Sequence, residues 1–334
     1  MHKKELGLFI LILVVGAVVT VINPLFLSGV NLGNTANLIG LFGLFAIAQA
    51  FVIITAGIDL SVGSVIALLG VLFVDLVGVQ GVAWPLAILL MIAVGLVMGA
   101  VHGLLIVRMG LQPFVVTLCG LLVYRGIARF YTADATAGFV YGQSFPDLEW
   151  LTVGRTYGVP HSVIVFLVVA VIAWVVLHRS VFGRHLFAVG KNEEAARYSG
   201  VRSGRVIIGA YVICSGLTAL SAIFFAMYTR SISPSSHGNF YELYAIAAAV
   251  LGGCSLRGGE GSIVGVVLGV ILLQVLQNLV NLLGIPSSLN FAVMGTVILI
   301  GVIADQQFAR FRDRRRAARS VEARLGEPVQ QHAE

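Results

Sequence analysis

The sequence predicts an all-α integral membrane protein with about ten transmembrane helices. Hydrophobic residues make up 58% of its 334 residues and charged residues only 11%, whereas soluble proteins carry about 25% charged residues. The apolar residues form long continuous segments rather than short alternating strands, and lipid admits only helices or closed barrels. We therefore expect eight to ten spanning helices, some of them short or broken.

Ten apolar segments are candidates for these helices. In chain order they are residues 6–22, 38–55, 65–78, 84–107, 113–130, 162–177, 206–228, 243–256, 263–283 and 289–303. A straight span needs about 20 residues, so we expect segments 65–78 and 243–256 to be broken, tilted or re-entrant. The first segment follows Lys3 and Lys4 as in a signal peptide, but it is long and no small-residue cleavage site follows it. We interpret it as an uncleaved span.

The lysines and arginines predict the orientation of these helices. If the N-terminus is inside, 17 of the 21 basic residues fall in segments on the inner side, in agreement with the positive-inside rule. Seven of them lie between residues 310 and 324, in a tail (306–334) that we expect to be cytoplasmic and disordered after a membrane domain at 1–305. A basic tail beside anionic lipid accounts for the formal charge of +6 without a nucleic-acid partner. Both termini are therefore predicted to be cytoplasmic.

An aspartate lies between two apolar segments, in the sequence Gly57-Ile58-Asp59-Leu60-Ser61-Val62-Gly63. A carboxylate is costly inside a membrane unless it has a role. Asp59 and Ser61 are residue types that cap helix N-termini, and Gly57 and Gly63 permit a tight bend or a close backbone approach. We predict a capped break between two helices, with direct substrate contact by Asp59 as the alternative.

The largest inner loop, residues 178–205, contains the signals of a short helix. Asn192 can cap its start, Glu193 suits the positive end of the helix dipole, Arg197 suits the negative end, and Gly200 can terminate it. Isolated helices this short are only marginally stable, so we expect a partner to pack on it. The alternative is a loop that only links two spans.

The largest outer loop, residues 132–161, has no clean helical period. We expect a short interfacial helix near residues 146–151. This loop is a surface connection or the docking site of an external partner.

The sequence lacks the patterns of an enzyme. Residues 257–262 are rich in glycine but lack the Gly-Lys-Ser/Thr ending of a phosphate-binding loop. The three cysteines have no paired spacing and the seven histidines are dispersed, so we expect neither a metal site nor a disulfide. His102 lies in an apolar helix, where a packed or hydrogen-bonded histidine is commoner than a ligand.

An ion-coupled secondary carrier is the main alternative class. Such carriers usually need buried ionisable residues. Only Asp75 falls within a predicted span, near its outer end, while Asp59 and Glu242 lie at span edges. These ionisable residues are few for such a carrier, although a sodium ion bound by backbone oxygens would not require them.

Several motifs in the same order resemble the permease subunits of the ribose-type branch of bacterial ABC sugar importers. The motifs occupy residues 57–63, 112–118, 124–128, 182–184, 188–196, 199–201, 242–248, 251–256 and 258–259. Lys191 and Cys254 depart from the usual glycine and threonine or serine. The resemblance extends from about residue 35 to about residue 305, which is most of the chain.

The resemblance implies an architecture of the vitamin-importer type in a bacterial plasma membrane, the inner membrane where there are two. It implies a second permease protomer, either an identical copy or a paralogue. It also implies a separate cytoplasmic subunit that binds ATP, so that this chain needs no cofactor, and an extracytoplasmic sugar-binding protein. The imported substrate would be a monosaccharide, such as a ribose-like pentose, a hexose or a deoxysugar.

Two groups of residues are candidates for the transport function. A sugar pathway needs transient polar contacts and aromatic faces, and its candidates, each of which could instead be structural, are Gln49, Gln112, Phe114, Thr117 and Asn239. The predicted inner helix would seat in the ATPase subunit, and its candidates are Asn192, Glu193, Ala195, Ala196, Arg197 and Gly200. We expect packing at the two alanines to matter more than the surface charges, because an exposed charge pair contributes only about 0–1 kcal/mol.

Overall fold

The computed structural model describes residues 3–286, 289, 292, 295–296 and 299. The chain divides into two units, Met1–Ile285 and Pro286–Glu334, and the first unit is described below. The predicted span at 289–303 belongs to the second unit and lies largely outside the described residues, as does the whole of the predicted tail at 306–334.

The described residues contain eight helices that are long and apolar enough to cross a membrane. They are α1 (Lys3–Ile22), α2 (Gly29–Ile54), α3 (Val62–Val74) with its π-helical extension η2 (Asp75–Val79), α4 (Trp84–Met109), α5 (Pro113–Tyr131), α7 (His161–His178), α10 (Ser203–Thr229) and α12 (Ile263–Leu282). The prediction of an all-α membrane protein with eight to ten spans is confirmed.

Shorter elements connect these helices. They are η1 (Pro24–Leu27), α6 (Pro146–Val153), α8 (Val181–Lys191), α9 (Glu193–Tyr198), α11 (Tyr241–Leu251) and four two-residue strands, β1 (Ala137–Gly138), β2 (Arg155–Thr156), β3 (Val159–Pro160) and β4 (Ser231–Ile232). Strand β1 pairs antiparallel with β4, and β2 with β3. The short helix predicted near 146–151 is confirmed as α6, and its interfacial position stays a prediction.

Segments 65–78 and 243–256, which we expected to be broken, tilted or re-entrant, differ in the structure. Helix α3 and its π-helical turn together reach 18 residues, from Val62 to Val79, which is close to a full span. Helix α11 has only 11 residues, so it is about 17 Å long and covers about half of a 30 Å hydrocarbon layer. Helix α11 is therefore too short for a straight span, and the expectation that this segment is broken, tilted or re-entrant stays a prediction.

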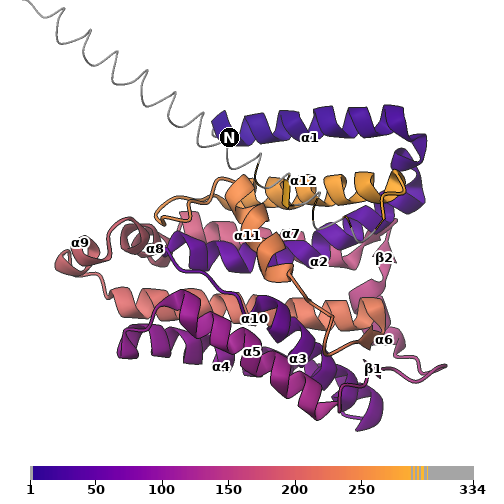
Figure 1. Cartoon of the computed structure of the whole chain (residues 1–334), viewed down its shortest axis with the longest axis horizontal. Helices are drawn as coiled ribbons and strands as arrows, with labels where there is room; N and C mark the ends of the chain where they lie inside the picture. Colours follow the sequence, from indigo (N-terminus) through magenta and orange to yellow (C-terminus); the bar gives the residue numbers. More distant parts are fainter. Residues whose placement is uncertain (1–2, 287–288, 290–291, 293–294, 297–298, 300–334) are drawn as a thin grey trace, which may run out of the picture. The chain divides into compact units, whose positions relative to one another are not determined.

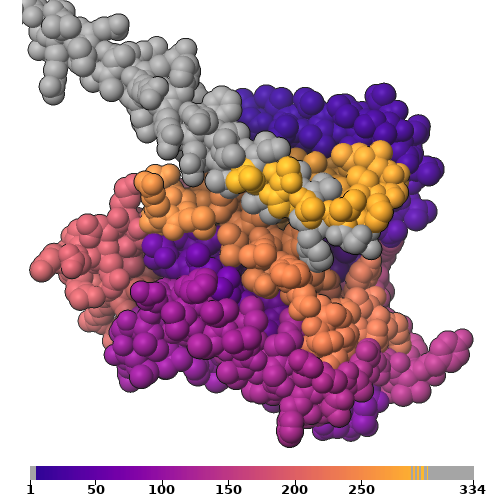
Figure 2. Space-filling view, viewed as in Figure 1, coloured from indigo at the N-terminus to yellow at the C-terminus, as the bar shows by residue number. Residues whose placement is uncertain are grey.

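Within this unit the long helices run side by side and have two distinct ends (Figure 1). Helices α8 and α9 and the start of α1 lie at one end, which we call the α9 end. Helix α6 with β1 and β2 lies at the other, the α6 end. Figure 2 shows α8 and α9 projecting from the rest of the unit. At the α9 end, the hydroxyl of Ser262 caps α12 and donates to Glu5 Oε1 at 2.6 Å.

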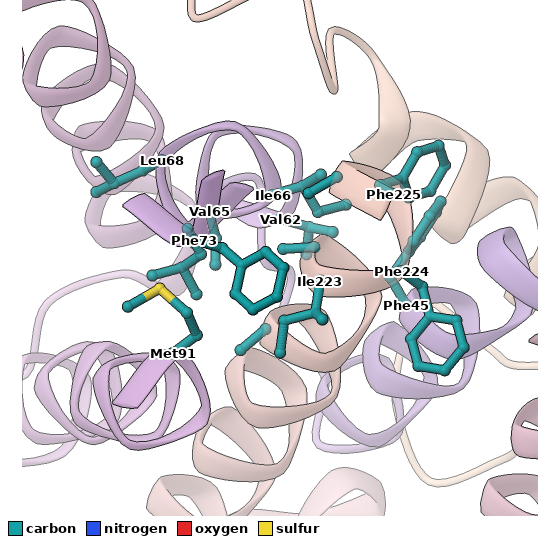
Figure 3. Packing of buried hydrophobic residues seen from close by; sticks show 14 of the residues in the cluster. Phe45, Val62, Val65, Ile66, Leu68, Phe73, Met91, Ile223, Phe224 and Phe225 are labelled. Atoms are coloured by element: carbon teal, nitrogen blue, oxygen red, sulfur yellow. The ribbon is translucent and has the colours of Figure 1, made fainter. Parts of the chain in front are cut away.

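The core lies where α2, α3, α4 and α10 meet (Figure 3). Phe45 of α2, Phe73 of α3, Met91 of α4 and Phe225 of α10 are buried there. Lipid is as apolar as these side chains, so the core is stabilised mainly by close packing rather than by exclusion of water. In contrast, most of α1 and α5 is exposed, as expected of helices that face lipid or another chain.

Candidate functional site at the break between α2 and α3

The chain between α2 and α3 is a non-helical segment, residues 55–61, which we call the break; it begins with a turn at Thr55 and Ala56 and is mostly buried from Gly57 onwards. Asp59 is 1% exposed, and its Oδ1 accepts hydrogen bonds from the backbone N–H of Ser61 at 2.8 Å and from its hydroxyl at 2.6 Å. Ser61 occupies the N-cap position of α3, but its side chain does not cap the helix. The predicted cap is therefore wrong in detail, because these two side chains bond to each other and stabilise the turn before the helix.

Neighbouring helices hold the backbone of the break. With its amide oriented to satisfy both atoms, Gln49 donates to the carbonyl oxygen of Asp59 at 3.2 Å and accepts from its N–H at 3.1 Å. The carbonyl oxygen of Ile58 accepts from Thr117 Oγ1 at 3.2 Å and from the Tyr211 hydroxyl at 3.3 Å. Three helices, α2, α5 and α10, thus fix two consecutive residues of the break.

A histidine lies beside the aspartate. His102 of α4 is 2% exposed, and its Nε2 lies 2.9 Å from the hydroxyl of Tyr124 on α5. Its Nδ1 lies 3.9 Å from Asp59 Oδ2. His102 is hydrogen-bonded, as the sequence suggested, but its position next to Asp59 was not predicted, since the two residues are 43 positions apart in the chain.

On the side facing the loop before α11, the start of α3 contacts a distant part of the chain. Gly63 and Gly238 approach so closely that a Cβ on either would overlap the carbonyl group of the other. The buried carboxylate of Glu242 faces the backbone N–H of Gly63, one of the helix donors without an intrahelical partner. Glu242 therefore lies at the start of α3, where the sequence suggested Asp59 or Ser61 as caps. Arg125 holds the same loop, since it donates to the carbonyl oxygens of Pro234 at 3.0 Å and His237 at 2.6 Å.

On the opposite side, the end of α2 contacts two further motifs. The carbonyl oxygen of Ile54 accepts from the N–H of Gly259 at 2.9 Å. A Cβ on Gly190, near the end of α8, would overlap this same oxygen. Motifs from five parts of the chain thus meet along the break.

A cavity of about 1070 Å³ opens at the α9 end, next to the break. The break, the α4–α5 turn, α9 and the start of α10 all contribute to its lining, with Gly57, Gln112, Glu193, Arg197, Gly200 and Tyr211 among the lining residues. Arg108, Arg202 and Arg205 also line it. Its volume is sufficient for a small ligand. The cavity joins the predicted inner helix to the Gly57–Gly63 motif.

The five pathway candidates do not come together in the structure. Gln112 lines the cavity, whereas Gln49 and Thr117 are fully buried and brace the break. Phe114 is 52% exposed and does not line the cavity. Asn239 is exposed in the loop before α11, where its Nδ2 donates to the carbonyl oxygen of Ser235.

The predicted inner helix is confirmed as α9. Asn192 Oδ1 accepts from the N–H of Ala195 at 2.9 Å, and Arg197 pairs with Glu193 at 3.1 Å. Gly200 follows the helix with a φ of +84°. Ala195 is exposed but Ala196 is 5% exposed, so the expectation that both alanines face a partner needs correction: Ala196 packs against its own chain.

Helix α8, directly before α9, was not predicted. Gly183, Leu186, Val189 and Gly190 form its buried face, and the hydroxyl of Ser180 caps it by accepting from the N–H of Gly183 at 3.1 Å. The buried residues at positions 183, 186, 189 and 190 have helical spacing. This pattern, together with Ser180, was the available signal.

The chain matches known transport proteins over most of its length. A family described as "branched-chain amino acid transport system / permease component" matches residues 31–302. The ribose import permease of Escherichia coli (strain K12) is 36% identical over 307 residues, which are 92% of this chain and 94% of that protein. The ribose import permease of Bacillus subtilis (strain 168) is 40% identical over 305 residues, 90% of this chain and 91% of that protein. The galactose/methyl galactoside import permease of Escherichia coli (strain K12) is 31% identical over 331 residues, 92% and 96% of the two chains. No solved structure matches the chain significantly.

Proposed function

The chain belongs to the ribose-type branch of ABC sugar permeases, and we propose that it forms the membrane pathway through which an importer carries a monosaccharide into a bacterial cell. The observation that supports this most strongly is the near-complete coverage of permeases named for ribose and galactose. A fructose import permease is also among the relatives. The proposed substrate class is therefore a neutral monosaccharide, either a pentose, a hexose or a deoxysugar.

Uptake by intact cells tests this substrate class. Cells in which the gene is deleted should lose uptake of one radiolabelled monosaccharide from a panel of ribose, fructose and galactose, and plasmid-borne expression should restore it. Uptake of leucine serves as the control, because the family description names branched-chain amino acids. Loss of leucine uptake with sugar uptake intact would contradict the proposal.

A separate ATPase subunit would drive the transport, docking at the α9 end. The support is the projecting pair α8–α9 beside the cavity and the match of residues 188–196 to the inner-loop motif of the family. Ala195 and Tyr198, which is 91% exposed, are the surfaces of α9 available to such a partner. A sugar-binding protein would dock at the α6 end, and the exposed apolar face of α5 suits a second permease protomer or lipid.

The proposed orientation places the α9 end in the cytoplasm. The support is the distribution of basic residues, which cluster in residues 179–205 and in the C-terminal tail. Single cysteines introduced at Glu149, in α6, and at Glu334 can be probed in intact cells with a membrane-impermeant thiol reagent. Labelling at Glu149 alone is expected, and labelling at Glu334 alone would reverse the orientation.

An ion-coupled carrier is the second candidate, because the structure gathers more buried ionisable groups than the sequence suggested. Asp59, His102 and Glu242 all lie near the break and are each less than 10% exposed. Proteoliposomes that contain the permease alone distinguish the two functions. We expect no uptake under an imposed sodium or proton gradient without the ATPase subunit and ATP, whereas gradient-driven uptake would establish the carrier.

A further inference from the structure

Two buried polar atoms beside the break face each other without hydrogen-bond partners. They are Asp59 Oδ2 and His102 Nδ1, 3.9 Å apart. The other carboxylate oxygen of Asp59 is occupied by Ser61, and the other ring nitrogen of His102 is occupied by Tyr124. The remaining atoms of the pair face each other, and the thiol of Cys214 on α10 is the other polar group beside the Asp59 carboxylate.

A proton fits this gap better than any other group. If the Tyr124 hydroxyl donates to Nε2, the ring proton lies on Nδ1 and points to Asp59. The 3.9 Å separation is too long for a direct hydrogen bond, so a small approach or one bridging water completes it. A metal cation at this place would lie against the imidazole ring. The protonated ring is itself a cation and would repel it. A second proton on the ring goes to Nε2, so that the Tyr124 hydroxyl then accepts from Nε2 instead of donating to it. The imidazolium and the Asp59 carboxylate form an ion pair, whose attraction is strong in a buried site.

We propose that Asp59 and His102 form a one-proton binding site and that His102 is a positioning residue, which holds the break through Asp59. With the ring protonated, the attraction between the charges pulls the break towards α4. With the ring neutral, the attraction between charges is lost, and the break keeps only the Nδ1–H donor of His102 and its other contacts. The site thereby connects the protonation state of one imidazole to the position of the Gly57–Gly63 motif.

The location of the pair makes this connection relevant to transport. Tyr211 lines the cavity at the α9 end, donates to the carbonyl oxygen of Ile58, and packs edge-on against the His102 ring with centroids 6.4 Å apart. Movement of Tyr211 would open a route for a proton from the cavity to the pair. The consequence for transport rests on the proposed function, but the proton site itself does not.

Other titratable groups near the pair come from three helices. They are Tyr124 of α5, Tyr211 and Cys214 of α10, and Glu242 of α11. Only Glu242 among them is a carboxylic acid, and it faces the start of α3 rather than the imidazole ring. Arg125 is the nearest cationic side chain on α5 in sequence, and it is engaged with the carbonyl oxygens of the loop before α11.

A direct test observes the imidazole itself. Full-length permease labelled with ¹⁵N-histidine in lipid nanodiscs gives imidazole resonances, and the one missing in His102→Gln belongs to His102. We expect this resonance to change as the pH is lowered from about 8 to about 4, and its transition to move to lower pH in Asp59→Asn, because the carboxylate that stabilises the protonated ring is then absent. His161→Gln is the matched control, because His161 is buried but has partners on both ring nitrogens. A His102 ring that does not titrate, or that titrates identically in Asp59→Asn, would overturn the proton site.

A functional test uses the complex reconstituted with its ATPase and sugar-binding protein, with sugar-stimulated ATP hydrolysis measured as a ratio to wild type across the same pH range. The ratio for His102→Gln should change by about fivefold over the range, whereas that for His161→Gln should stay constant. His102→Leu should lower stimulation about tenfold, and adding Asp59→Asn should restore it by about threefold, because no charged carboxylate is then left unpaired. The positioning role would be refuted if the ratio for His102→Gln stayed constant across the pH range and Asp59→Asn did not restore stimulation in His102→Leu. If the ring titrates but sugar never stimulates the wild-type complex, the proposed function fails and the proton site stands.

Discussion

The break and the α8–α9 segment were both marked by motifs in the sequence, but they are stabilised in opposite ways. The break is buried and held by side chains or backbone from α4, α5, α8, α10, the loop before α11 and the turn at Gly259. Helix α9 is largely exposed, and its cap and ion pair come from Asn192, Glu193 and Arg197, within six residues of one another. The difference suggests that substitutions in the break should affect the whole fold, and that those in α9 should act locally.

The largest expected effect is at Gly63, where two backbones touch. In Gly63→Val a side chain would overlap the carbonyl group of Gly238, and neither backbone can move without displacing α3 or the loop before α11. We expect a loss of about 3 kcal/mol or more in stability and little permease in the membrane. Thermal unfolding in detergent and immunoblotting of membranes measure this.

The control is Gly126→Val on α5, where a Cβ would meet nothing within 4 Å. It should leave stability close to wild type. If both variants are equally stable, the contact between Gly63 and Gly238 does not hold the break. The break would then not depend on long-range contacts more than α9 does.

The next effect is at Asp59. Asp59→Ala removes the acceptor of two hydrogen bonds from Ser61 in a buried site, which should cost about 2 kcal/mol. Asp59→Asn keeps an oxygen that can accept from the N–H of Ser61 and should cost less, and Asp59→Ser, which also keeps an acceptor, should be intermediate. Uptake is compared with membrane abundance for each variant. Equal loss of uptake in all three at normal abundance would show that the negative charge, rather than the turn, is what transport requires.

The sequence predicted local features of these regions better than their long-range contacts. Asn192 as a cap and the break itself follow from residue types and spacing, which act over a few positions. The position of Glu242 at the start of α3 could not be predicted, because Glu242 lies 179 positions after Gly63 and only the fold brings them together. Gln49 is a pathway candidate because a sugar needs polar contacts, whereas in the structure its side chain satisfies the backbone of Asp59.

A smaller effect is expected in α9, and it separates two adjacent alanines. Ala196 is buried against its own chain and Ala195 is exposed. Ala196→Trp should destabilise the permease by about 1 kcal/mol, at the low end of overpacking, because a surface helix can shift. Ala195→Trp should leave the thermal stability of the permease unchanged and abolish sugar-stimulated ATP hydrolysis in the reconstituted complex, while Glu193→Gln changes it little. Normal stimulation in Ala195→Trp with the ATPase subunit still bound would place the coupling contact elsewhere.

The smallest effect tests whether distance along the chain or burial decides the strength of a contact. Arg230 and Glu149 are far apart in sequence, like the contacts of the break, but their ion pair at 2.7 Å is partly exposed. The hydrogen bond from Arg230, followed by that from the N–H of Phe145, lowers the pKa of Glu149 below its ordinary value of 4.5. A lowered pKa means that the stabilisation is complete above pH 4.5 and is lost as the pH falls below it.

This pair should contribute less than about 1 kcal/mol, and its loss should be confined to α6. Fluorescence of Trp150, in a variant whose other two tryptophans are replaced by phenylalanine, reports on α6 during titration from about pH 7 to about pH 3. Arg230→Gln should move the transition to higher pH, because the carboxylate then loses the partner that lowers its pKa. Arg129→Gln is the control, since Arg129 forms an exposed pair with Asp134 instead. If Arg230→Gln destabilised the whole permease as much as Gly63→Val, long-range contact alone, without burial, would account for the stability of the break.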